Sequence, residues 1–493
     1  MSVPVSTLPA IAEAAAAAAP QLARMTLEDR AALLEALAAA LEGAREELVA
    51  LADKETSLGA TRLDGELSRT TGQLQLFATV LRDGGYLEAT IDHADLAITP
   101  PRPDLRRYLI PLGPVAVFSA SNFPFAFSVA GGDTASALAA GCPVVVKGHS
   151  GHPELSRRTA AVVEARLDEL GLHPGTFGHV QGRENGLQLV TAPPIKAVGF
   201  TGSLAAGRSL FDLAVRRSDP IPFYGELSSI NPVVIAPQAA ADRADTIAEG
   251  LVSSVTLGVG QFCTKPGLVF VPDGSAVPEA VERALADPAM SGPRPMLNQR
   301  IIDSYREDLN SLVALTGVRL IAGEITMPEH TGALPAIFDV TLSALQENLD
   351  ALTNECFGPT SVLVRYRDLD QLRNMLGSLP GALVGCLHAQ PAEQSALAPV
   401  FDALQALAGR VVIDGWPTGV AVAWSMNHGG PWPATTNAMH TSVGGTAIRR
   451  FLRPVTYQDV PDPLLPPALR ETNPLQIPRR VDGRLLTGGK SPV

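Results

Sequence analysis

The sequence lacks both an excess of basic residues and long apolar runs. Its 493 residues include 38 Lys and Arg against 50 Asp and Glu, which gives a formal net charge of −12. Nucleic acids and anionic membranes attract proteins through cationic side chains that neutralise phosphates, so this balance disfavours both as partners. No run of about eighteen apolar residues, the length that spans a bilayer, is present either.

Cysteine and aromatic residues are also scarce. Aromatic residues make up 5% of the chain, and the cysteines Cys142, Cys263, Cys356 and Cys386 lie far apart without a Cys-x-x-Cys pair. This spacing indicates neither a disulfide framework nor a zinc site, so we expect a cytoplasmic protein with free thiols and no bound metal. The 46% of hydrophobic residues suffice for a large core, and the length predicts two or three domains.

Strand and helix patterns alternate from Gly113 onward. Buried strands are predicted at residues 115–118, 143–147, 177–180 and 197–200, with helices at 128–140 and 155–170 between them. This repetition predicts an α/β fold with a doubly wound parallel sheet, whose ligands bind at the carboxyl ends of its strands. Before it, we expect helices up to about Leu87 and a two-stranded arm formed by residues 96–98 and 108–110.

A glycine-rich turn at residues 202–207 follows the strand at 197–200. A turn of this kind that opens a helix offers free N–H groups to a phosphate, which indicates a nucleotide site. The turn also differs by one residue from a P-loop, so a nucleoside-triphosphatase with an acidic strand at 410–414 is an alternative. Arg208 stands where a P-loop has lysine, and its wider guanidinium group fits poorly into the tight phosphate-binding loop.

A candidate nucleophile and a candidate base each follow a core element. Cys263 lies in Gly260-Gln261-Phe262-Cys263, and Glu226 lies 37 positions upstream (263 − 226). This layout is typical of covalent catalysis, although a lone thiol more often packs in a core and most carboxylates face solvent. A cysteine hydrolase or acyltransferase that pairs Cys263 with His428 or His440 is a second alternative outside redox chemistry.

Several short motifs follow one another along nearly the whole chain. In order they are Asn122-Phe123-Pro124, Lys147, Phe200-Thr201-Gly202-Ser203 through Gly207, Glu226-Leu227, Gly260-Gln261-x-Cys263, Glu355-x-Phe357-Gly358-Pro359 and Pro417-Thr418-Gly419-Val420. Together, and in this order, they resemble the aldehyde dehydrogenase superfamily. The resemblance implies oxidation of an aldehyde to a carboxylic acid through a covalent thioester, with an NAD or NADP cofactor.

The resemblance implies a role for each matched residue. Cys263 resembles the nucleophile, Glu226 the general base for the deacylating water, and Asn122 a donor of the oxyanion hole. The neighbours of Glu226 are small or apolar, so we expect its pKa to rise toward neutrality. The expected cofactor-binding residues are Lys147, Ser150, Arg183, Gly202, Ser203, Gly207, Glu355 and Phe357. The expected tunnel residues are Phe123, Phe127, Phe262 and Trp416, with no cationic anchor assigned.

One departure from the family pattern bears on the cofactor. Most members carry Glu three residues after the strand lysine, whereas here Ser150 follows Lys147. The missing negative charge admits the 2′-phosphate of NADP, and Arg183 is a candidate partner for the adenosine end. We therefore expect NADP in preference to NAD.

Other segments bear on the substrate. Residues 119–134, 228–232 and 428–436 resemble the branch that contains 2-oxoglutarate semialdehyde (2,5-dioxopentanoate) dehydrogenases, so we expect an oxo-acid semialdehyde as the small-molecule substrate. The same branch includes an NADP-dependent long-chain aldehyde dehydrogenase, which leaves a fatty aldehyde as the alternative.

The resemblance also implies a domain organisation. Residues 1–91 and 112–230 are expected to form a dinucleotide-binding domain, and residues 231–446 a second α/β domain that carries Cys263. Residues 92–111 and 447–493 are expected to form a β oligomerisation arm, which would make the protein a homodimer or homotetramer.

Overall fold

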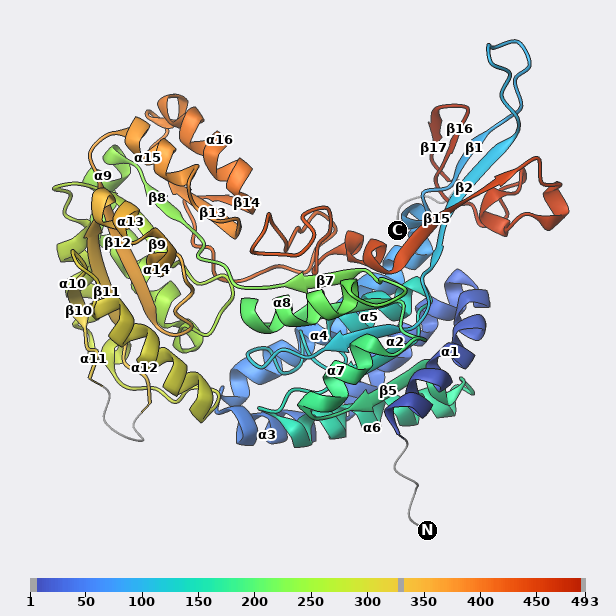
Figure 1. Cartoon of the computed structure of the whole chain (residues 1–493), viewed down its shortest axis with the longest axis horizontal. Coiled ribbons are helices and arrows are strands. Elements are labelled where there is room, and N and C mark those ends of the chain that lie inside the picture. Colours follow the sequence, from blue (N-terminus) through green and yellow to red (C-terminus); the bar gives the residue numbers. More distant parts are fainter. Residues whose placement is uncertain (1–6, 327–331, 489–493) are drawn as a thin grey trace.

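The computed structural model describes residues 7–326 and 332–488, which form two α/β bodies and a β arm (Figure 1). The chain begins with α1 (Leu8–Arg24), α2 (Leu27–Gly43), α3 (Arg45–Thr56) and α4 (Ala60–Asp83), followed by a short turn, η1 (Gly85–Leu87). Thr26 caps α2 by accepting the N–H of Asp29 at 3.0 Å, and leucines at helical spacing are buried along one face. The predicted N-terminal helical region is confirmed.

A five-stranded parallel sheet forms the core of the first body, in the order β5-β4-β3-β6-β7. The strands β3 (Val115–Phe118), β4 (Val144–Lys147), β5 (Phe177–Val180) and β6 (Ala197–Thr201) match the predicted positions, and β7 (Phe223–Glu226) completes the sheet. Helices lie between successive strands, which confirms the α/β class. They are α5 (Gly132–Ala140), α6 (Pro153–Glu169), α7 (Arg183–Thr191) and α8 (Leu204–Val215), with a turn η2 (Pro174–Thr176) before β5.

Helix α5 begins four residues later than its predicted start at residue 128. The residues before it form turns that fold tightly on themselves: a Cβ at Gly131 would lie 2.5 Å from the Ala126 carbonyl oxygen. Glycine is therefore needed where these turns meet the helix, and the turns hold Asn122 and Phe123 at the carboxyl end of β3.

The second body is built on a seven-stranded sheet in the order β10-β11-β12-β9-β8-β13-β14, in which only β10 is antiparallel to its neighbour among the described strands. Its strands are β8 (Val233–Ile235), β9 (Leu268–Pro272), β10 (Arg319–Gly323), β11 (Ala336–Thr341), β12 (Thr360–Tyr366), β13 (Ala382–His388) and β14 (Ala408–Ile413). The helices are α9 (Pro237–Thr256), α10 (Val277–Leu285), α11 (Pro288–Ser291), α12 (Gln299–Val313), α13 (Leu342–Glu347), α14 (Leu349–Leu352), α15 (Leu369–Leu376) and α16 (Ala398–Leu407), with turns η3 (Leu257–Gly260) and η4 (Gln394–Leu397).

The segment between β14 and β15, residues 414–444, crosses back over β7 without regular structure (Figure 1). Leu227 donates its N–H to the Ala434 carbonyl at 2.8 Å, and Thr436 donates to the Gly225 carbonyl at 3.0 Å. Gly381, in the second body, donates to the Trp432 carbonyl at 3.1 Å. This segment, which the sequence places with the second domain, is therefore bonded to both bodies and pairs directly with the strand that carries Glu226.

The arm is a five-stranded sheet in the order β15-β2-β1-β16-β17. It joins β1 (Thr90–Asp92) and β2 (Leu105–Pro111) to β15 (Leu452–Gln458), β16 (Arg479–Val481) and β17 (Arg484–Leu486); the turns η5 (Gly445–Phe451), η6 (Asp462–Leu464) and η7 (Pro467–Leu469) lie in the same C-terminal region. The predicted strand at residues 96–98 is wrong, because these residues lie in the exposed loop and the pairing strand lies at 90–92.

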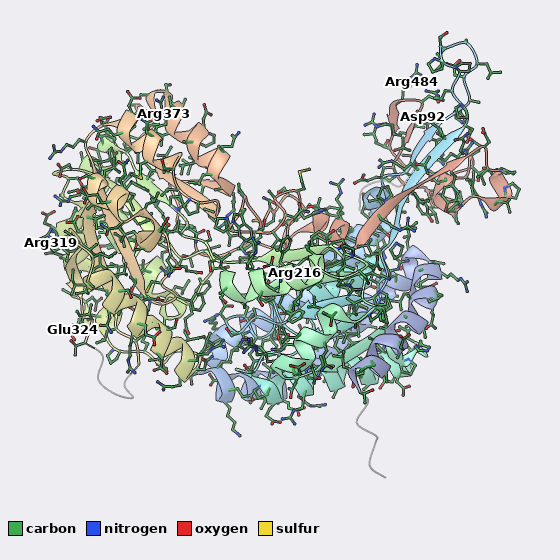
Figure 2. All side chains as sticks on the ribbon, in the orientation of Figure 1. Asp92, Arg216, Arg319, Glu324, Arg373 and Arg484 are labelled. Carbon is green, nitrogen blue, oxygen red and sulfur yellow. The ribbon has the colours of Figure 1, made fainter. Side chains whose placement is uncertain are left out.

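Charged side chains such as Arg319, Arg373 and Arg484 lie on the outside of the molecule (Figure 2). Within the described ranges, none of the helices has both the length and the apolar character needed to cross a bilayer.

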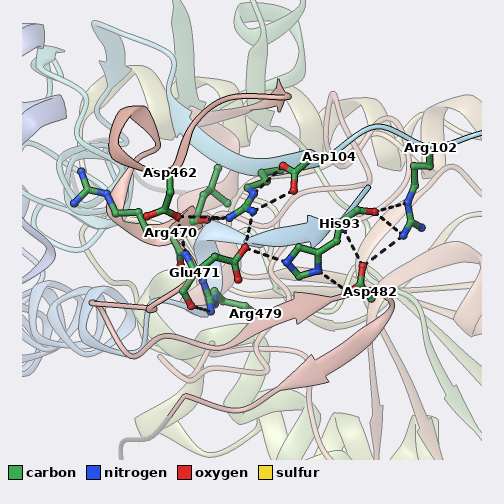
Figure 3. Close-up of polar contacts among 10 residues, drawn as sticks. His93, Arg102, Asp104, Asp462, Arg470, Glu471, Arg479 and Asp482 are labelled. Atoms are coloured by element: carbon green, nitrogen blue, oxygen red, sulfur yellow. Dashed lines mark hydrogen bonds and ion pairs between the residues drawn. The ribbon is translucent and has the colours of Figure 1, made fainter. Parts of the chain in front are cut away.

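A network of charged side chains holds the C-terminal tail on the arm (Figure 3). The ring of His93 lies between two carboxylates, with Nδ1 2.7 Å from Asp482 and Nε2 3.0 Å from Glu471. Arg106 extends the network, because it contacts Asp104 at 2.9 Å and Glu471 at 2.5 Å. Hydrogen bonds to Asp482 and Glu471 raise the pKa of His93 above its ordinary value, so folding favours its protonated form.

This network makes the docking of β16 and β17 dependent on pH. The folded-state pKa of His93 is raised. Its contribution to the stability of this docking is therefore complete below the ordinary pKa near 6.5 and is lost as pH rises through the raised pKa. We expect hydrogen-exchange protection factors in β16 and β17, corrected for intrinsic rates, to fall over that window. His93→Gln should abolish the pH dependence, whereas His173→Gln, on a remote turn, should preserve it. If protection in His93→Gln still fell with pH as it does in the unaltered protein, this role of His93 would be contradicted.

Candidate active site

Cys263 lies in the turn that follows α9 and η3, where its backbone is fixed from both sides. Asn231 Nδ2 donates to the carbonyls of Cys263 at 2.7 Å and Lys265 at 2.9 Å. Gly260, at φ +65°, approaches the Gly358 carbonyl so closely that a Cβ would lie 2.2 Å from its oxygen. The turn therefore requires glycine at this position and holds the thiol rigidly at the junction of the two bodies.

Glu226 lies at the carboxyl end of β7 with its side chain buried against His428. Its Oε1 lies 2.8 Å from His428 Nε2, and its Oε2 accepts a hydrogen bond of 2.5 Å from the Ser442 hydroxyl. The same His428 nitrogen lies 3.6 Å from Cys263 Sγ. A thiol, a carboxylate and an imidazole from distant parts of the chain thus lie together, and their ligand atoms fall within 4.8 Å of one another.

The charge of Glu226 differs from the sequence-based expectation. Burial raises the pKa of this carboxyl, but His428, Ser442 and Cys263 oppose that effect and bring the pKa below its ordinary value. The expectation of a pKa near neutrality is therefore wrong. The residues next to Glu226 in sequence are small or apolar, but the groups that stabilise its negative charge come from distant parts of the chain.

The thiol of Cys263 behaves in the opposite way. Burial and the neighbouring negative charges of Glu226 and Glu355 raise its pKa well above the ordinary value, while Arg69 lowers it. At neutral pH the proton therefore resides on sulfur, and a carboxylate lies ready to accept it. The raised pKa of Cys263 and the lowered pKa of Glu226 therefore favour a protonated thiol beside an ionised carboxylate rather than a standing thiolate.

Asn122 lies beside the thiol turn. Its Nδ2 donates to the Gln261 carbonyl at 3.0 Å, and Gln261 in turn accepts the N–H of Leu297 at 3.0 Å through Oε1. A side-chain amide has two N–H groups, so Asn122 can donate its second one to a substrate oxygen. Asn122 is buried, which strengthens such a bond.

The predicted tunnel residues separate into two groups. The rings of Phe123 and Phe127 lie 5.4 Å apart, those of Phe123 and Phe262 lie 5.3 Å apart, and Phe127 lies 6.0 Å from the His428 ring. These phenylalanines form one aromatic cluster beside the thiol. Trp416 lies elsewhere: it packs on His388 at 4.8 Å in the core of the second body, so assigning it to the tunnel is not supported by its surroundings.

The predicted cofactor residues lie at the carboxyl ends of the first sheet. Ser203 caps α8 by accepting the Ala206 N–H at 3.4 Å, and a Cβ at Gly207 would lie 2.1 Å from Leu227, so only glycine lets α8 approach this closely. Gly202 donates its N–H to the Glu226 carbonyl at 3.1 Å, which joins this turn to the catalytic strand. A capped helix N-terminus beside a sheet edge suits a pyrophosphate.

Lys147 ends β4 and supplies a cation to the same edge. Among the described residues no hydrogen bond or ion pair is recorded for its ammonium group, and burial together with Arg300 lowers its pKa. Ser150 is exposed just beyond it, and Arg183 is exposed at the start of α7 after β5. A cation without a protein partner and a free hydroxyl are a donor set that suits the adenosine ribose and phosphates of a dinucleotide.

Glu355 reaches this edge from the second body, and both Glu355 and Phe357 are partly buried. Burial raises the pKa of Glu355 to about 7, while the ammonium of Lys265 and a hydrogen bond with Ser228 oppose the shift. Glu355 therefore lies against residues just after Glu226, where a nicotinamide ribose hydroxyl could be held. The donor set of this structure fits a dinucleotide from the adenosine end to the nicotinamide end.

The P-loop alternative fails on geometry. Arg208, which would have to point into the phosphate cradle, is exposed and pairs with Asp212 at 3.0 Å along α8. The proposed acidic strand is β14, at the edge of the other sheet, and Asp414 beyond it pairs with Arg243 at 2.7 Å.

Three side chains that lie at the site were not among the residues expected from the family resemblance. His428 entered only as the base of an alternative hydrolase, and it lies 165 positions after Cys263 in irregular chain. Arg62 and Arg69, on α4, lie over the aromatic cluster. Their seven-residue spacing, two helical turns, was the available signal, but charges on an amphipathic helix ordinarily face solvent.

Comparisons with known proteins agree with this geometry. The model of the aldehyde dehydrogenase family matches residues 5–432. The chain is 48% identical to the alpha-ketoglutaric semialdehyde dehydrogenase 2 of Azospirillum brasilense and 43% identical to the alpha-ketoglutaric semialdehyde dehydrogenase of Acinetobacter baylyi, in each case over 93% of this chain and 88% of the relative. The crystal structure of a Thermus 1-pyrroline-5-carboxylate dehydrogenase with bound NAD has a TM-score of 0.76 at 20% identity, covering 91% of this chain and 85% of that one.

This chain therefore belongs to the aldehyde dehydrogenase family. It is an oxidoreductase that acts on an aldehyde with a nicotinamide cofactor.

The charge of Glu226 can be tested through the reactivity of Cys263. Because that carboxylate raises the thiol pKa, Glu226→Gln should lower it and increase the rate of iodoacetamide alkylation at pH 8 about tenfold, the change in thiolate fraction for one pKa unit. Mass spectrometry resolves this site from Cys142, Cys356 and Cys386, which are buried. Glu249→Gln, an exposed change on α9, should have no effect. A slower reaction in Glu226→Gln would contradict the assigned electrostatics.

Proposed function

We propose that this chain oxidises 2-oxoglutarate semialdehyde to 2-oxoglutarate with NADP, using Cys263 as nucleophile and Glu226 as base. The observation that carries the proposal is the position of the Cys263 thiol, 3.6 Å from His428 and within 4.8 Å of a carboxylate oxygen of the buried Glu226. The substrate rests on the two alpha-ketoglutaric semialdehyde dehydrogenases that are 48% and 43% identical along nearly the whole chain.

The residues divide the reaction into two halves. In the first, the Cys263 proton passes to Glu226 as sulfur bonds to the aldehyde carbon, and the oxygen of the adduct accepts hydrogen bonds from Asn122 Nδ2 and the Cys263 N–H. A nicotinamide cofactor, held by the residues described above, would supply the hydride acceptor that converts this adduct into a thioester. Glu226 releases the thiol proton to solvent between the two halves. In the second half, Glu226 takes a proton from water as the water attacks the thioester, and it passes that proton to the departing sulfur, which restores the thiol and releases the acid.

His428 and Ser442 act on Glu226 rather than on the substrate. Their contacts at 2.8 Å and 2.5 Å keep the carboxylate ionised although it is buried. An ionised Glu226 is needed twice in each cycle, so these two residues hold the base ready for both halves of the reaction.

The preference for NADP rests on charge at the end of β4. Arg300, on α12 of the second body, is close enough for its charge to lower the pKa of Lys147. Both cations also lower the pKa of His149. Asn298, the N-cap of α12, lies beside Gly151 in the same loop. Two cations and the Ser150 hydroxyl support the choice of NADP, because they would attract a 2′-phosphate, whereas a carboxylate at residue 150 would repel it.

The domain and oligomer assignments also belong to this proposal. The first sheet would bind the dinucleotide, the second would carry the nucleophile, and the arm would join copies into a homodimer or homotetramer. Large apolar side chains exposed on the arm support this role: Leu96 is 82% exposed, Leu485 64% and Leu486 49%.

Substrate and nucleophile can be tested together. We expect kcat/KM to be highest for 2-oxoglutarate semialdehyde, lower for succinate semialdehyde and lowest for decanal, measured by NADPH absorbance. Cys263→Ala should abolish NADPH formation while calorimetry shows unchanged NADP binding. Glu226→Gln should lower turnover about 100-fold or more. A preference for decanal would replace the proposed substrate with a fatty aldehyde, and NADPH formation by Cys263→Ala would refute the nucleophile.

Cofactor choice has its own test. Ser150→Glu should lower the ratio of kcat/KM with NADP to that with NAD about tenfold or more, because the new charge faces the 2′-phosphate. Ser218→Glu, an exposed change between α8 and β7, adds the same charge far from the edge and should leave the ratio unchanged. If both variants behave alike, selectivity is set by other residues.

A further inference from the structure

Two arginines on α4 point into the aldehyde site instead of outward. The guanidinium of Arg62 lies 5.4 Å from the centre of the Phe123 ring and 5.1 Å from that of Phe262. Arg69, two turns further along, lies 5.6 Å from the Phe123 ring and 5.1 Å from the Phe127 ring. Both cations therefore stack on the aromatic cluster beside Cys263, and the rings hold their planes in place.

Their hydrogen-bonding groups are largely unused. Arg62 donates through Nη2 to the Asn122 carbonyl at 2.7 Å, but its buried Nη1 has no partner. Arg69 Nε and Nη2 are buried without a partner, and no hydrogen bond is recorded for this side chain within the described ranges. Buried guanidinium N–H groups are costly to leave unpaired, so this arrangement indicates an anionic ligand that is bound in the working enzyme.

The only carboxylate on the same face of α4 is committed elsewhere. Glu66 lies between the arginines in sequence, and its Oε1 accepts the N–H groups of Phe125 at 2.8 Å and Ala126 at 3.0 Å. It forms no recorded ion pair with Arg62 or Arg69 among the described residues. Arg69 also acts electrostatically on the buried Glu226, but among the described residues neither Glu66 nor Glu226 forms a recorded ion pair with a guanidinium. The buried, unpartnered N–H groups therefore remain available to a substrate anion.

Arg69 lies between the thiol and a hollow that is open to solvent. It lines this hollow of about 480 Å³ between α4 and residues 420–422, whose other lining residues include Gly72, Leu76 and Val420. The charge of Arg69 also acts on both Cys263 and Glu226. The guanidinium is therefore close both to solvent and to the thiol.

We propose that Arg62 and Arg69 bind the carboxylate of the aldehyde substrate, with the unused Nη1 of Arg62 and the Nε and Nη2 of Arg69 as donors. The inference deepens the proposed function, on which it rests for the position of the reacting aldehyde. The substrate class is an aldehyde whose far end carries a carboxylate, with an adjacent keto oxygen as a further acceptor. A fatty aldehyde would leave both cations buried and unpaired, so the pair selects against it.

The test compares two aldehydes of equal chain length, 2-oxoglutarate semialdehyde and pentanal, which lacks the carboxylate. Arg69→Gln and Arg62→Gln should each lower kcat/KM for the oxo acid about 10- to 100-fold, the usual effect of a lost hydrogen bond to a charged group. With pentanal, kcat/KM should change less than about threefold. Arg82→Gln, on the same helix but paired with surface carboxylates, should leave both values unchanged.

An equal loss with both aldehydes would overturn the proposal, because it would mean that the arginines only support the site. Unchanged discrimination between the two aldehydes would overturn it as well. Arg69→Lys keeps the positive charge but lacks the planar guanidinium. Its kcat/KM for the oxo acid should fall by less than that of Arg69→Gln, with no change for pentanal. This variant keeps the test possible if Arg69→Gln does not fold.

A binding measurement separates this inference from the proposed substrate. In the Cys263→Ala background, calorimetry with glutarate should give a dissociation constant about tenfold or more weaker after Arg69→Gln, with NADP binding unchanged. If the wild type prefers succinate semialdehyde yet Arg69→Gln removes its preference for carboxylates, the proposed substrate is wrong and the anchor stands. If glutarate binds equally well to both forms, the anchor is wrong whatever the substrate.

Discussion

One buried carboxylate sets the requirements of the whole site. Glu226 is 3% exposed, yet His428, Ser442 and the Cys263 thiol keep it ionised. A charge this deep would cost several kcal/mol if these donors were absent. The donors come from the segment 414–444 and from the turn after η3, so the two bodies must be assembled before the carboxylate can be both buried and charged. The pairing of Thr436 with Gly225 and of Leu227 with Ala434 accomplishes this, because it ties the segment along the edge of β7.

The sequence predicts the parts of this structure that depend on local pattern. Strands β3, β4 and β6 are mostly buried apolar runs, and Cys263, Glu226 and Lys147 lie at or just after core elements in ordered motifs, so their positions could be inferred. The start of α5 could not, because turns that place Asn122 consume the first residues of an apparently helical stretch. The strand at residues 90–92 is short and half-buried, and its pairing depends on the distant tail, whereas the more apolar residues 96–98 lie in an exposed loop.

The electrostatics of the site was the least predictable part. Glu226 has small or apolar neighbours in sequence, and that pattern alone indicates a raised pKa. The lowered pKa depends on His428 and Ser442, which lie more than two hundred residues away in irregular chain (428 − 226 = 202; 442 − 226 = 216).

The arginines of α4 were equally hard to recognise from the sequence. Glu, Arg and Gln alternate with leucine along that helix, so Arg62 and Arg69 resemble ordinary solvent-facing charges. Only tertiary packing reveals that this face meets Phe123, Phe127 and Phe262 instead of water.

Substrate anchoring and thiol activation are coupled through Arg69. The positive charge of Arg69 lowers the pKa of Cys263, which opposes burial and the charge of Glu226. A substrate carboxylate that pairs with Arg69 removes part of this assistance, so anchoring by itself makes the thiol harder to ionise. In the proposed mechanism, deprotonation is then completed by Glu226, whose carboxylate lies within 4.8 Å of the sulfur, and it is driven by the bond that forms to the aldehyde carbon. The proton therefore leaves sulfur when the substrate is in place, and the resting enzyme keeps a protonated thiol that is less exposed to oxidation.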